Sequence, residues 1–108
     1  MRIANFIIAG TEKAGTTSVF TYLSEHPEVC AASRKETDFF CDHWKTDRNR
    51  SLREYAGYFS HCPADVPIVM EASPGYLGDA ELVVPRIAQI LKDVRILFIL
   101  RDPVERIY

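Results

Sequence analysis

A short loop bounded by two glycines constrains the fold of this chain more than any other feature. Residues 10–17 read GTEKAGTT, between an apolar run at residues 3–9 and a segment with helical spacing at residues 18–26. A strand, a glycine-bounded loop and a helix in that order bring backbone N–H groups and a helix N-terminus to one point, where they bind anions. Lys13 adds a positive charge to the loop. We therefore expect a phosphate-like group to bind at residues 10–17.

The loop departs from the P-loop of nucleoside triphosphatases at one informative position. That pattern is G-x-x-x-x-G-K-[ST]. Gly10 and Gly15 fit it, but Thr16 stands where the lysine is expected, and the basic residue, Lys13, lies inside the loop. The pattern favours a phosphate-like ligand without the usual β,γ-phosphate and Mg²⁺ arrangement. An ordinary tight turn between a strand and a helix is the alternative for this loop taken alone.

Length and charge exclude several classes of protein. The 108 residues allow one small domain, residues 1–108, and an apolar content of 47% is sufficient for a core. The net charge is −2, with 13 basic and 15 acidic residues well mixed, so no nucleic-acid partner is expected. The apolar run at residues 96–100 is too short to span a membrane. Since the first strand leaves no room for a signal peptide, the sequence predicts a cytoplasmic protein.

The cysteines give a further expectation about the compartment. Cys30, Cys41 and Cys62 are odd in number and show no C-x-x-C spacing. We interpret them as free thiols in a reducing compartment, neither a disulfide framework nor a metal site.

Apolar periodicity predicts strands that alternate with helices. The expected strands cover residues 2–9, 67–71 and 94–100, with a short extended piece at 28–32. The expected helices cover residues 16–26, 51–60 and 79–92, the last best formed after Pro85, and another helix opens at Pro103. This order predicts an α/β fold with a P-loop-like parallel sheet flanked by helices. Functional loops then lie at the carboxyl ends of strands, at residues 10–17, 71–76 and 101–103.

Four segments, in this order along the chain, resemble one enzyme family. Residues 13–18 (KAGTTS) and 100–106 (LRDPVER) resemble the 5′-phosphosulfate and 3′-phosphate segments of sulfotransferases that use 3′-phosphoadenosine 5′-phosphosulfate (PAPS). Residues 35–40 (KETDFF) and 71–76 (EASPGY) resemble the K-E-x-x-F-F and E-x-[ST]-P-x-Y segments of the glycan-type and bacterial branch. The resemblance implies the N-terminal, cofactor-binding part of a larger single domain. We expect such a fragment to show marginal stability, exposed apolar surface, or association with another chain, such as self-association.

The resemblance also implies a role for each site residue. The 5′-phosphate would be bound by Lys13, Ala14, Gly15, Thr16, Thr17 and Ser18. Lys13 would also neutralise the bridging oxygen as the sulfuryl group leaves, and Arg101 would bind the 3′-phosphate. Glu36 would be the base that takes a proton from an acceptor hydroxyl or amine. The implied transfer is in-line, needs no metal and leaves 3′,5′-adenosine bisphosphate as product. The resemblance does not choose among a glycan, a lipid, a polyketide and a small metabolite as the acceptor.

By residue type alone, Glu36 has a simpler interpretation. Residues 33–40 are a charged cluster that runs into an aromatic pair, which is typical of a solvated turn anchored to the core by Phe39 and Phe40. The alternative is a carboxylate beside basic residues and apolar rings, where its proton affinity is tuned.

Three positions depart from the family pattern. Ala72 stands where a lysine often assists the sulfate, so Lys13 acts without it or Arg34 or Lys35 replaces it. Asp38 stands where a histidine is frequent. The serine expected eight residues after Arg101 would be residue 109, after the last residue of this sequence.

Two other functions remain as alternatives. A P-loop kinase or nucleoside triphosphatase needs lysine at position 16 and an acidic residue that ends a buried strand; Asp102 follows such a strand, but Arg101 intervenes. An inactive nucleotide-binding module is the second alternative.

Overall fold

The computed structural model describes residues 2–10, 16–34 and 36–99. Its strands are β1 (Phe6–Gly10), β2 (Val29–Ala31), β3 (Ile68–Ala72) and β4 (Arg95–Ile99). Its helices are α1 (Thr16–Ser24), α2 (Phe39–Asp42), α3 (Arg48–Ala56), the 3₁₀ turn η2 (Gly57–Phe59), α4 (Gly75–Gly78) and α5 (Ala80–Ile90). The strands predicted from the apolar runs are therefore confirmed, with bounds that differ by a few residues.

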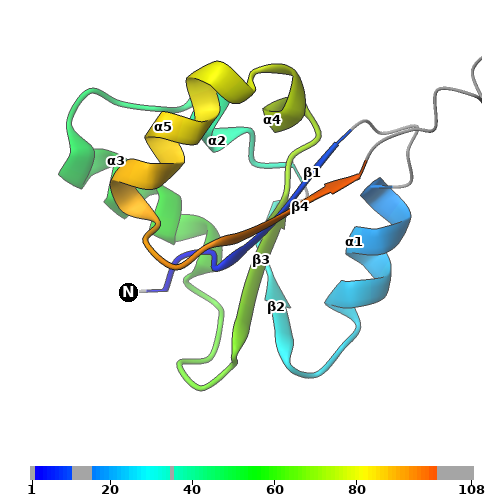
Figure 1. The fold of residues 1–108 in the computed structure, drawn as a ribbon. Coiled ribbons are helices and arrows are strands. Elements are labelled where there is room, and N and C mark those ends of the chain that lie inside the picture. The colour runs from blue at the N-terminus through cyan, green and yellow to red at the C-terminus, as the bar shows by residue number, and fades with distance from the viewer. Residues whose placement is uncertain (1, 11–15, 35, 100–108) are drawn as a thin grey trace, which may run out of the picture.

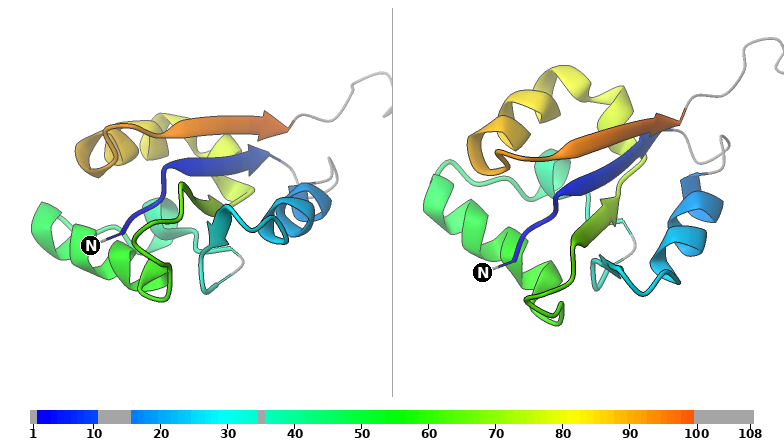
Figure 2. Two further views of the ribbon diagram at one scale, coloured as in Figure 1. Left: turned by 90° about the horizontal axis from the view of Figure 1, so that it is seen from below. Right: turned by 60° about the horizontal axis from the view of Figure 1, so that its bottom comes forward.

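The strands form one parallel sheet in the order β2-β3-β1-β4. Figure 1 shows α1 on one face of this sheet and α2, α3, α4 and α5 on the other, and Figure 2 shows the same three layers from two further sides. This architecture confirms the predicted α/β class.

Successive side chains of the two central strands, β1 and β3, point to opposite faces of the sheet. Each face therefore has its own apolar core. Ile7 and Val69 face the layer of α2 to α5, while Ile8 and Met70 face α1 with Phe20. All four of these strand residues are buried, because helices cover both faces of the central strands. The nearly continuous apolar runs in the sequence have this physical origin.

Helix α5 begins earlier than its proline suggested. The sequence favoured a helix formed mainly after Pro85, but α5 starts at Ala80 and contains Pro85. Val83, on the turn before the proline, is buried together with Ile87 and Ile90. Burial of this stripe against the sheet offsets the one backbone hydrogen bond that proline cannot make.

Helix α3 also begins earlier than predicted. Asp47 caps its N-terminus by accepting hydrogen bonds from the backbone N–H groups of Asn49 and Arg50. A capping aspartate stabilises the first turn of a helix by about 1 kcal/mol, so the helix extends to Arg48 instead of starting at Ser51.

The cysteine prediction was wrong for two of the three residues. Cys30 on β2 and Cys62, after η2, form a disulfide, whereas Cys41 is free. The two are 32 residues apart, and only the return of the chain towards β3 brings them together. Because disulfides persist in oxidising compartments, this pairing does not support the reducing compartment that was expected from free thiols.

Strand β4 is an edge of the sheet among the described residues, and it exposes apolar side chains. Leu97 is 39% exposed and Phe98 is 45% exposed. This is the exposed apolar surface that the sequence led us to expect. Within the described residues, no helix has the length and apolarity needed to cross a membrane.

We predict that the disulfide contributes substantially to stability. Replacing both Cys30 and Cys62 by serine should lower the free energy of unfolding by roughly 3–4 kcal/mol, because the crosslink restricts the unfolded chain. Urea denaturation with and without a reducing agent measures this. Cys41→Ser is the matched control, since Cys41 lies outside the disulfide. Equal stability of the double variant and the control would contradict the prediction.

Candidate functional site

The connections of the sheet change direction between β1 and β3. From β1 the chain passes through α1 to β2, beyond β3; from β3 it passes through α4 and α5 to β4, beyond β1. The two connections lie on opposite faces of the sheet. In open α/β sheets, ligands bind outside the carboxyl ends of the strands at such a switch point. The candidate site is therefore at the ends of β1 and β3.

The loop at residues 10–17 starts at this point. Gly10 ends β1 with φ 146°, a backbone conformation that favours glycine. Thr16 and Thr17 open α1, and Ser18 is exposed on its first turn. Figure 1 shows the start of α1 at the same end of the sheet as the arrowheads of β1 and β4.

Several predicted ligand-binding residues lie outside the described part of the chain. These are Lys13, Ala14 and Gly15 in the loop, and Arg101 after β4. Their predicted roles stay predictions.

The segments 36–40 and 71–76, which the resemblance singled out, contact each other at the end of β3. The backbone N–H of Asp38 donates to Ser73 Oγ at 3.1 Å. Thr37 Oγ1 lies 3.5 Å from the same oxygen. The backbone N–H of Ser73 in turn donates to the carbonyl of Ile8 on β1 at 3.0 Å. Glu36 is half-buried and directly precedes Thr37 in the chain.

A fully buried carboxyl group, that of Glu71, lies at the centre of this contact. Its Oε1 accepts hydrogen bonds from Thr37 Oγ1 and Ser73 Oγ, both at 3.0 Å. Its Oε2 accepts a hydrogen bond from the hydroxyl of Tyr55 on α3. The Tyr76 hydroxyl lies 3.3 Å from Thr37 Oγ1. One carboxyl group therefore joins the end of β3 to the segment after Glu36, and also to α3.

Burial also changes the proton affinities of these groups. Burial raises the pKa of Glu71 above its ordinary value and outweighs the hydroxyl donors, which act in the opposite direction. Burial, together with the nearby Glu71 carboxyl, raises the pKa of Tyr55 and of Tyr76. Burial, with a contribution from Asp42, raises the pKa of Asp38.

Asp38 occupies an uncommon backbone conformation. Its φ is 47°, in the left-handed region, which aspartate tolerates better than most residues. Uncommon backbone geometry of this kind clusters at functional sites. The turn lets residues 36 and 37 run along the end of the sheet before α2 begins.

The aromatic pair after this turn anchors the segment, as the simpler interpretation of the sequence expected. Phe39 and Phe40 are buried, and their ring centroids lie 5.0 and 4.9 Å from that of Tyr55. Aromatic pairs at such distances stabilise a fold beyond their buried area. Anchoring and a catalytic role for Glu36 are compatible, because the two phenylalanines follow the segment that reaches the switch point.

The position where the family often has lysine is apolar here. Ala72 is buried with Ile8, Phe20 and Met70 under α1. Of the substitutes considered from the sequence, Arg34 is exposed and Lys35 lies outside the described residues.

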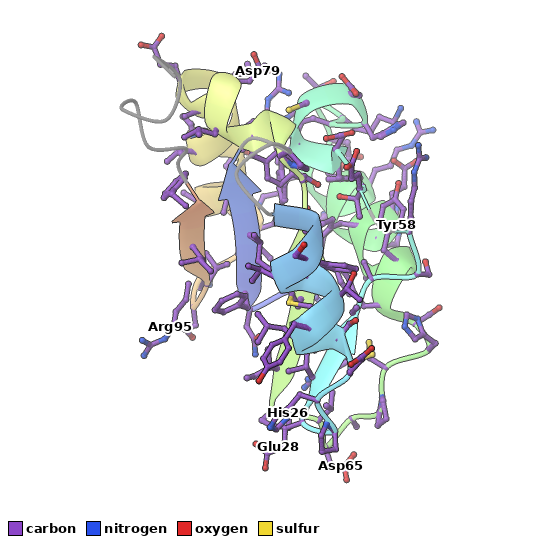
Figure 3. All side chains as sticks on the ribbon, turned by 90° about the vertical axis from the view of Figure 1, so that its right-hand side faces the viewer. His26, Glu28, Tyr58, Asp65, Asp79 and Arg95 are labelled. Carbon is purple, nitrogen blue, oxygen red and sulfur yellow. A yellow bond between two sulfur atoms is a disulfide. The ribbon has the colours of Figure 1, made fainter. Side chains whose placement is uncertain are left out.

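One of the histidines, His26, lies away from the candidate site. His26 accepts a hydrogen bond from the backbone N–H of Glu28 in the turn after α1. Figure 3 shows His26, Glu28 and Asp65 at one end of the molecule and Asp79 at the other end. The strand arrowheads point towards the end that carries Asp79, so His26 lies away from the switch point.

One group of potential metal ligands occurs among the described residues. Cys30, His61 and Cys62 place their ligand atoms within 4.8 Å of one another. The two sulfurs are bonded to each other, so neither offers the thiolate that a metal needs.

Comparison with known proteins gives independent evidence about the family to which this chain is related. No family model matches the chain. It is 33% identical over 106 residues to the membrane-associated sulfotransferase kil1 of Dictyostelium discoideum. That alignment covers 96% of this chain and 21% of kil1. It is also 34% identical over 102 residues to human heparan sulfate glucosamine 3-O-sulfotransferase 3B1. That alignment covers 93% of this chain and 24% of the human protein. The chain is related to the sulfotransferases.

A solved structure agrees with these relatives. The fold superposes on a sulfotransferase from Alicyclobacillus acidocaldarius with a TM-score of 0.73 and 28% sequence identity. The match covers 98% of this chain and 47% of that sulfotransferase. The described fold therefore corresponds to about half of the bacterial sulfotransferase, and the resemblance of the chain to sulfotransferases is confirmed.

The sequence did not reveal how Glu71 is used. The segment at residues 71–76 was recognised by its resemblance to the family. The sequence predicted only that Glu71 lies at the end of a strand, and no partner for its carboxyl group. Hydroxyls at positions 37, 55, 73 and 76 are scattered over 40 residues, and only the fold brings them together. A carboxylate that directly follows the apolar residues 68–70 was the available signal.

We predict a distinct pH dependence for Glu71. Since its pKa is raised in the folded state, its stabilising contribution is full below the ordinary value of 4.5 and is lost as the pH rises through its folded pKa. The stability of the wild type relative to Glu71→Gln should therefore decline as the pH rises above 4.5. Urea denaturation of both proteins across the pH range measures this difference. A difference that is independent of pH would contradict the prediction.

Proposed function

We propose that this chain forms the donor-binding part of a sulfotransferase active centre. It binds PAPS at the ends of β1 and β4 and supplies the base for transfer to an acceptor hydroxyl or amine. The observation that carries the proposal is the contact of the 36–38 segment with the end of β3, beside β1. Glu36 directly precedes Thr37 in the chain, and this supports a position for Glu36 near the end of β1, where the loop at residues 10–17 begins.

The chemistry requires positioning, charge neutralisation and one base. The acceptor oxygen or nitrogen forms a bond to sulfur while the bond from sulfur to the bridging phosphate oxygen breaks. Lys13 neutralises the charge on that oxygen as 3′,5′-adenosine bisphosphate leaves. Glu36 takes the acceptor proton.

Residues of the loop, of the first turn of α1 and of the segment after β4 complete the donor site in this proposal. Backbone N–H groups of residues 13–17 and the hydroxyls of Thr16, Thr17 and Ser18 bind the 5′-phosphate. Arg101 binds the 3′-phosphate as a charge-assisted, bidentate donor. Main-chain donors at the N-terminus of α1 suit an anion whether or not side-chain cations are added.

A glycan is the acceptor class that the relatives favour. Two kinds of related sulfotransferase carry heparan sulfate in their names, one a glucosamine 3-O-sulfotransferase and the other a bifunctional N-deacetylase/N-sulfotransferase. A sugar hydroxyl or amine is accordingly the first acceptor to test. This chain spans about a fifth to a quarter of the two relatives compared above, so the acceptor is assigned by assay of the full-length protein.

Binding experiments separate this function from its alternatives. Calorimetry should show binding of 3′,5′-adenosine bisphosphate and no comparable binding of ATP with Mg²⁺. The reverse preference would favour a P-loop kinase or nucleoside triphosphatase. Transfer of labelled sulfate from PAPS to a glycan acceptor by the full-length protein excludes an inactive nucleotide-binding module.

Lys13 and Arg101 should affect the reaction in different ways. Lys13→Ala should lower kcat more than it weakens donor binding, because Lys13 acts where charge develops in the transition state. Arg101→Ala should weaken binding of 3′,5′-adenosine bisphosphate by roughly 2–4 kcal/mol, the effect of removing one partner of a desolvated charge pair. Steady-state kinetics and calorimetry measure the two effects.

Arg95→Ala is the matched control for Arg101→Ala. Arg95 is exposed at the start of β4, at the opposite end of that strand from residue 101. Unchanged affinity in Arg101→Ala would show that the donor site is assigned wrongly.

Glu36→Gln should keep donor binding and lower transfer by ~10²–10⁴-fold, the usual contribution of a general base. The change is nearly isosteric and removes only the ability to accept the proton. Glu28→Gln is the control, because Glu28 lies at the other end of the molecule. Near-normal transfer by Glu36→Gln would remove Glu36 from the mechanism and leave His43 and His61 as the next candidates.

A further inference from the structure

Three consecutive backbone N–H groups in the segment that follows Glu36 donate to side-chain hydroxyls. The pairs are Asp38 with Ser73 Oγ at 3.1 Å, Phe39 with Thr37 Oγ1 at 3.3 Å, and Phe40 with the Tyr76 hydroxyl at 3.4 Å. These amides form the turn into α2 and its first residues, where no intrahelical acceptor is available. The hydroxyls therefore hold the backbone that follows Glu36.

The same hydroxyls are oriented by Glu71. Thr37 and Ser73 both donate to Glu71 Oε1. A carboxylate only accepts hydrogen bonds. With each hydroxyl hydrogen directed at Glu71, the oxygen lone pairs of Thr37 and Ser73 remain free to accept from the backbone amides. The direction of the whole network is set by its one acceptor-only member.

We propose that Glu71 is a positioning residue for Glu36. By fixing the hydroxyls of Thr37 and Ser73, it sets the backbone directly after Glu36 and thus the position from which that carboxylate reaches the acceptor. This inference rests on the function proposed above, in which Glu36 is the base. Glu71 itself touches neither donor nor acceptor and takes no proton in the reaction.

Stability alone does not account for this arrangement. A fully buried carboxyl group is costly to desolvate, and the side chains that donate to it within the described part of the chain are uncharged hydroxyls. An apolar side chain at the end of β3 would avoid that cost. What the carboxylate adds is direction, since it holds Asp38 in its left-handed conformation through Ser73.

The test compares variants of the full-length protein in PAPS-dependent transfer. Glu71→Gln and Thr37→Val should lower kcat about 10- to 100-fold, because a small misplacement of a reacting group has an effect of this size. The KM for PAPS should stay within about twofold, since donor contacts are unchanged. Thr37→Ser keeps the hydroxyl and should restore kcat to within about threefold of the wild type.

Ser51→Ala is the control for a purely structural effect. Ser51 is also fully buried, and its hydroxyl bonds to the backbone N–H and carbonyl of Lys45, away from the switch point. Ser51→Ala should lower the melting temperature as Thr37→Val does, but its kcat should stay within about twofold of the wild-type value. If kcat falls in proportion to the loss of stability in both Ser51→Ala and Thr37→Val, the positioning role is wrong.

A second variant and a second readout keep the test decisive if Glu71→Gln folds poorly. Tyr55→Phe removes only the donor to Oε2, so the side of Glu71 that bonds Thr37 and Ser73 remains and kcat should change less than in Thr37→Val. Amide hydrogen exchange should speed up at residues 38–40 in Thr37→Val and not in Thr37→Ser. Unchanged exchange in both would overturn the inference.

The two proposals fail in different ways. A wild-type protein that transfers no sulfate from PAPS would overturn the proposed function. An active wild type with an unchanged kcat in both Thr37→Val and Glu71→Gln would overturn only the positioning role of Glu71.

Discussion

The parallel pairing of β1 with β3 brings together the parts of this chain that carry its chemistry. In the sequence, the loop that begins at Gly10 and the segment that begins at Glu71 are about 60 residues apart. Pairing of Phe6 with Met70 and of Ile8 with Ala72 sets the carboxyl ends of the two strands beside each other. Because the connections leave this pair in opposite directions, its carboxyl ends form the kind of switch point at which ligands bind in open α/β sheets. Apolar burial on both faces of the sheet stabilises the pair.

Around this pair, a polar network and an apolar core share the same residues. Tyr55 packs its ring against Phe39 and Phe40 while its hydroxyl donates to Glu71. The aromatic packing therefore fixes the distance between α3 and β3 that the hydrogen bond requires. A satisfied buried network of this kind specifies one arrangement, since every hydroxyl that loses its partner carries a desolvation cost.

The sequence predicted those features that local pattern determines. The strands β1 and β3 were recognised because burial on both faces leaves a continuous apolar run, and the glycine loop because it follows one such run. Strand β4 was recognised from its apolar run alone, although it exposes Leu97 and Phe98 at the edge of the sheet. The pairing of Cys30 with Cys62 was missed because spacing along the chain carries no information about a contact made through β2. The first turn of α5 was underestimated because the burial of Val83 is a tertiary effect. Glu71 was placed correctly at a strand end, but apart from Ser73 its partners come from two other segments, those of Thr37 and Tyr55.

Strand alternation also gives a physical meaning to the alanine at position 72. Glu71 points into the layer of α2 to α5, so its neighbour Ala72 points towards α1, where it packs with Phe20. A lysine there would extend from the α1 face towards the helix N-terminus at which the phosphate-like group is expected. With alanine, that face contributes packing and no charge. In the proposed reaction, neutralisation of the leaving oxygen then depends more heavily on Lys13 and on the backbone N–H groups at the start of α1.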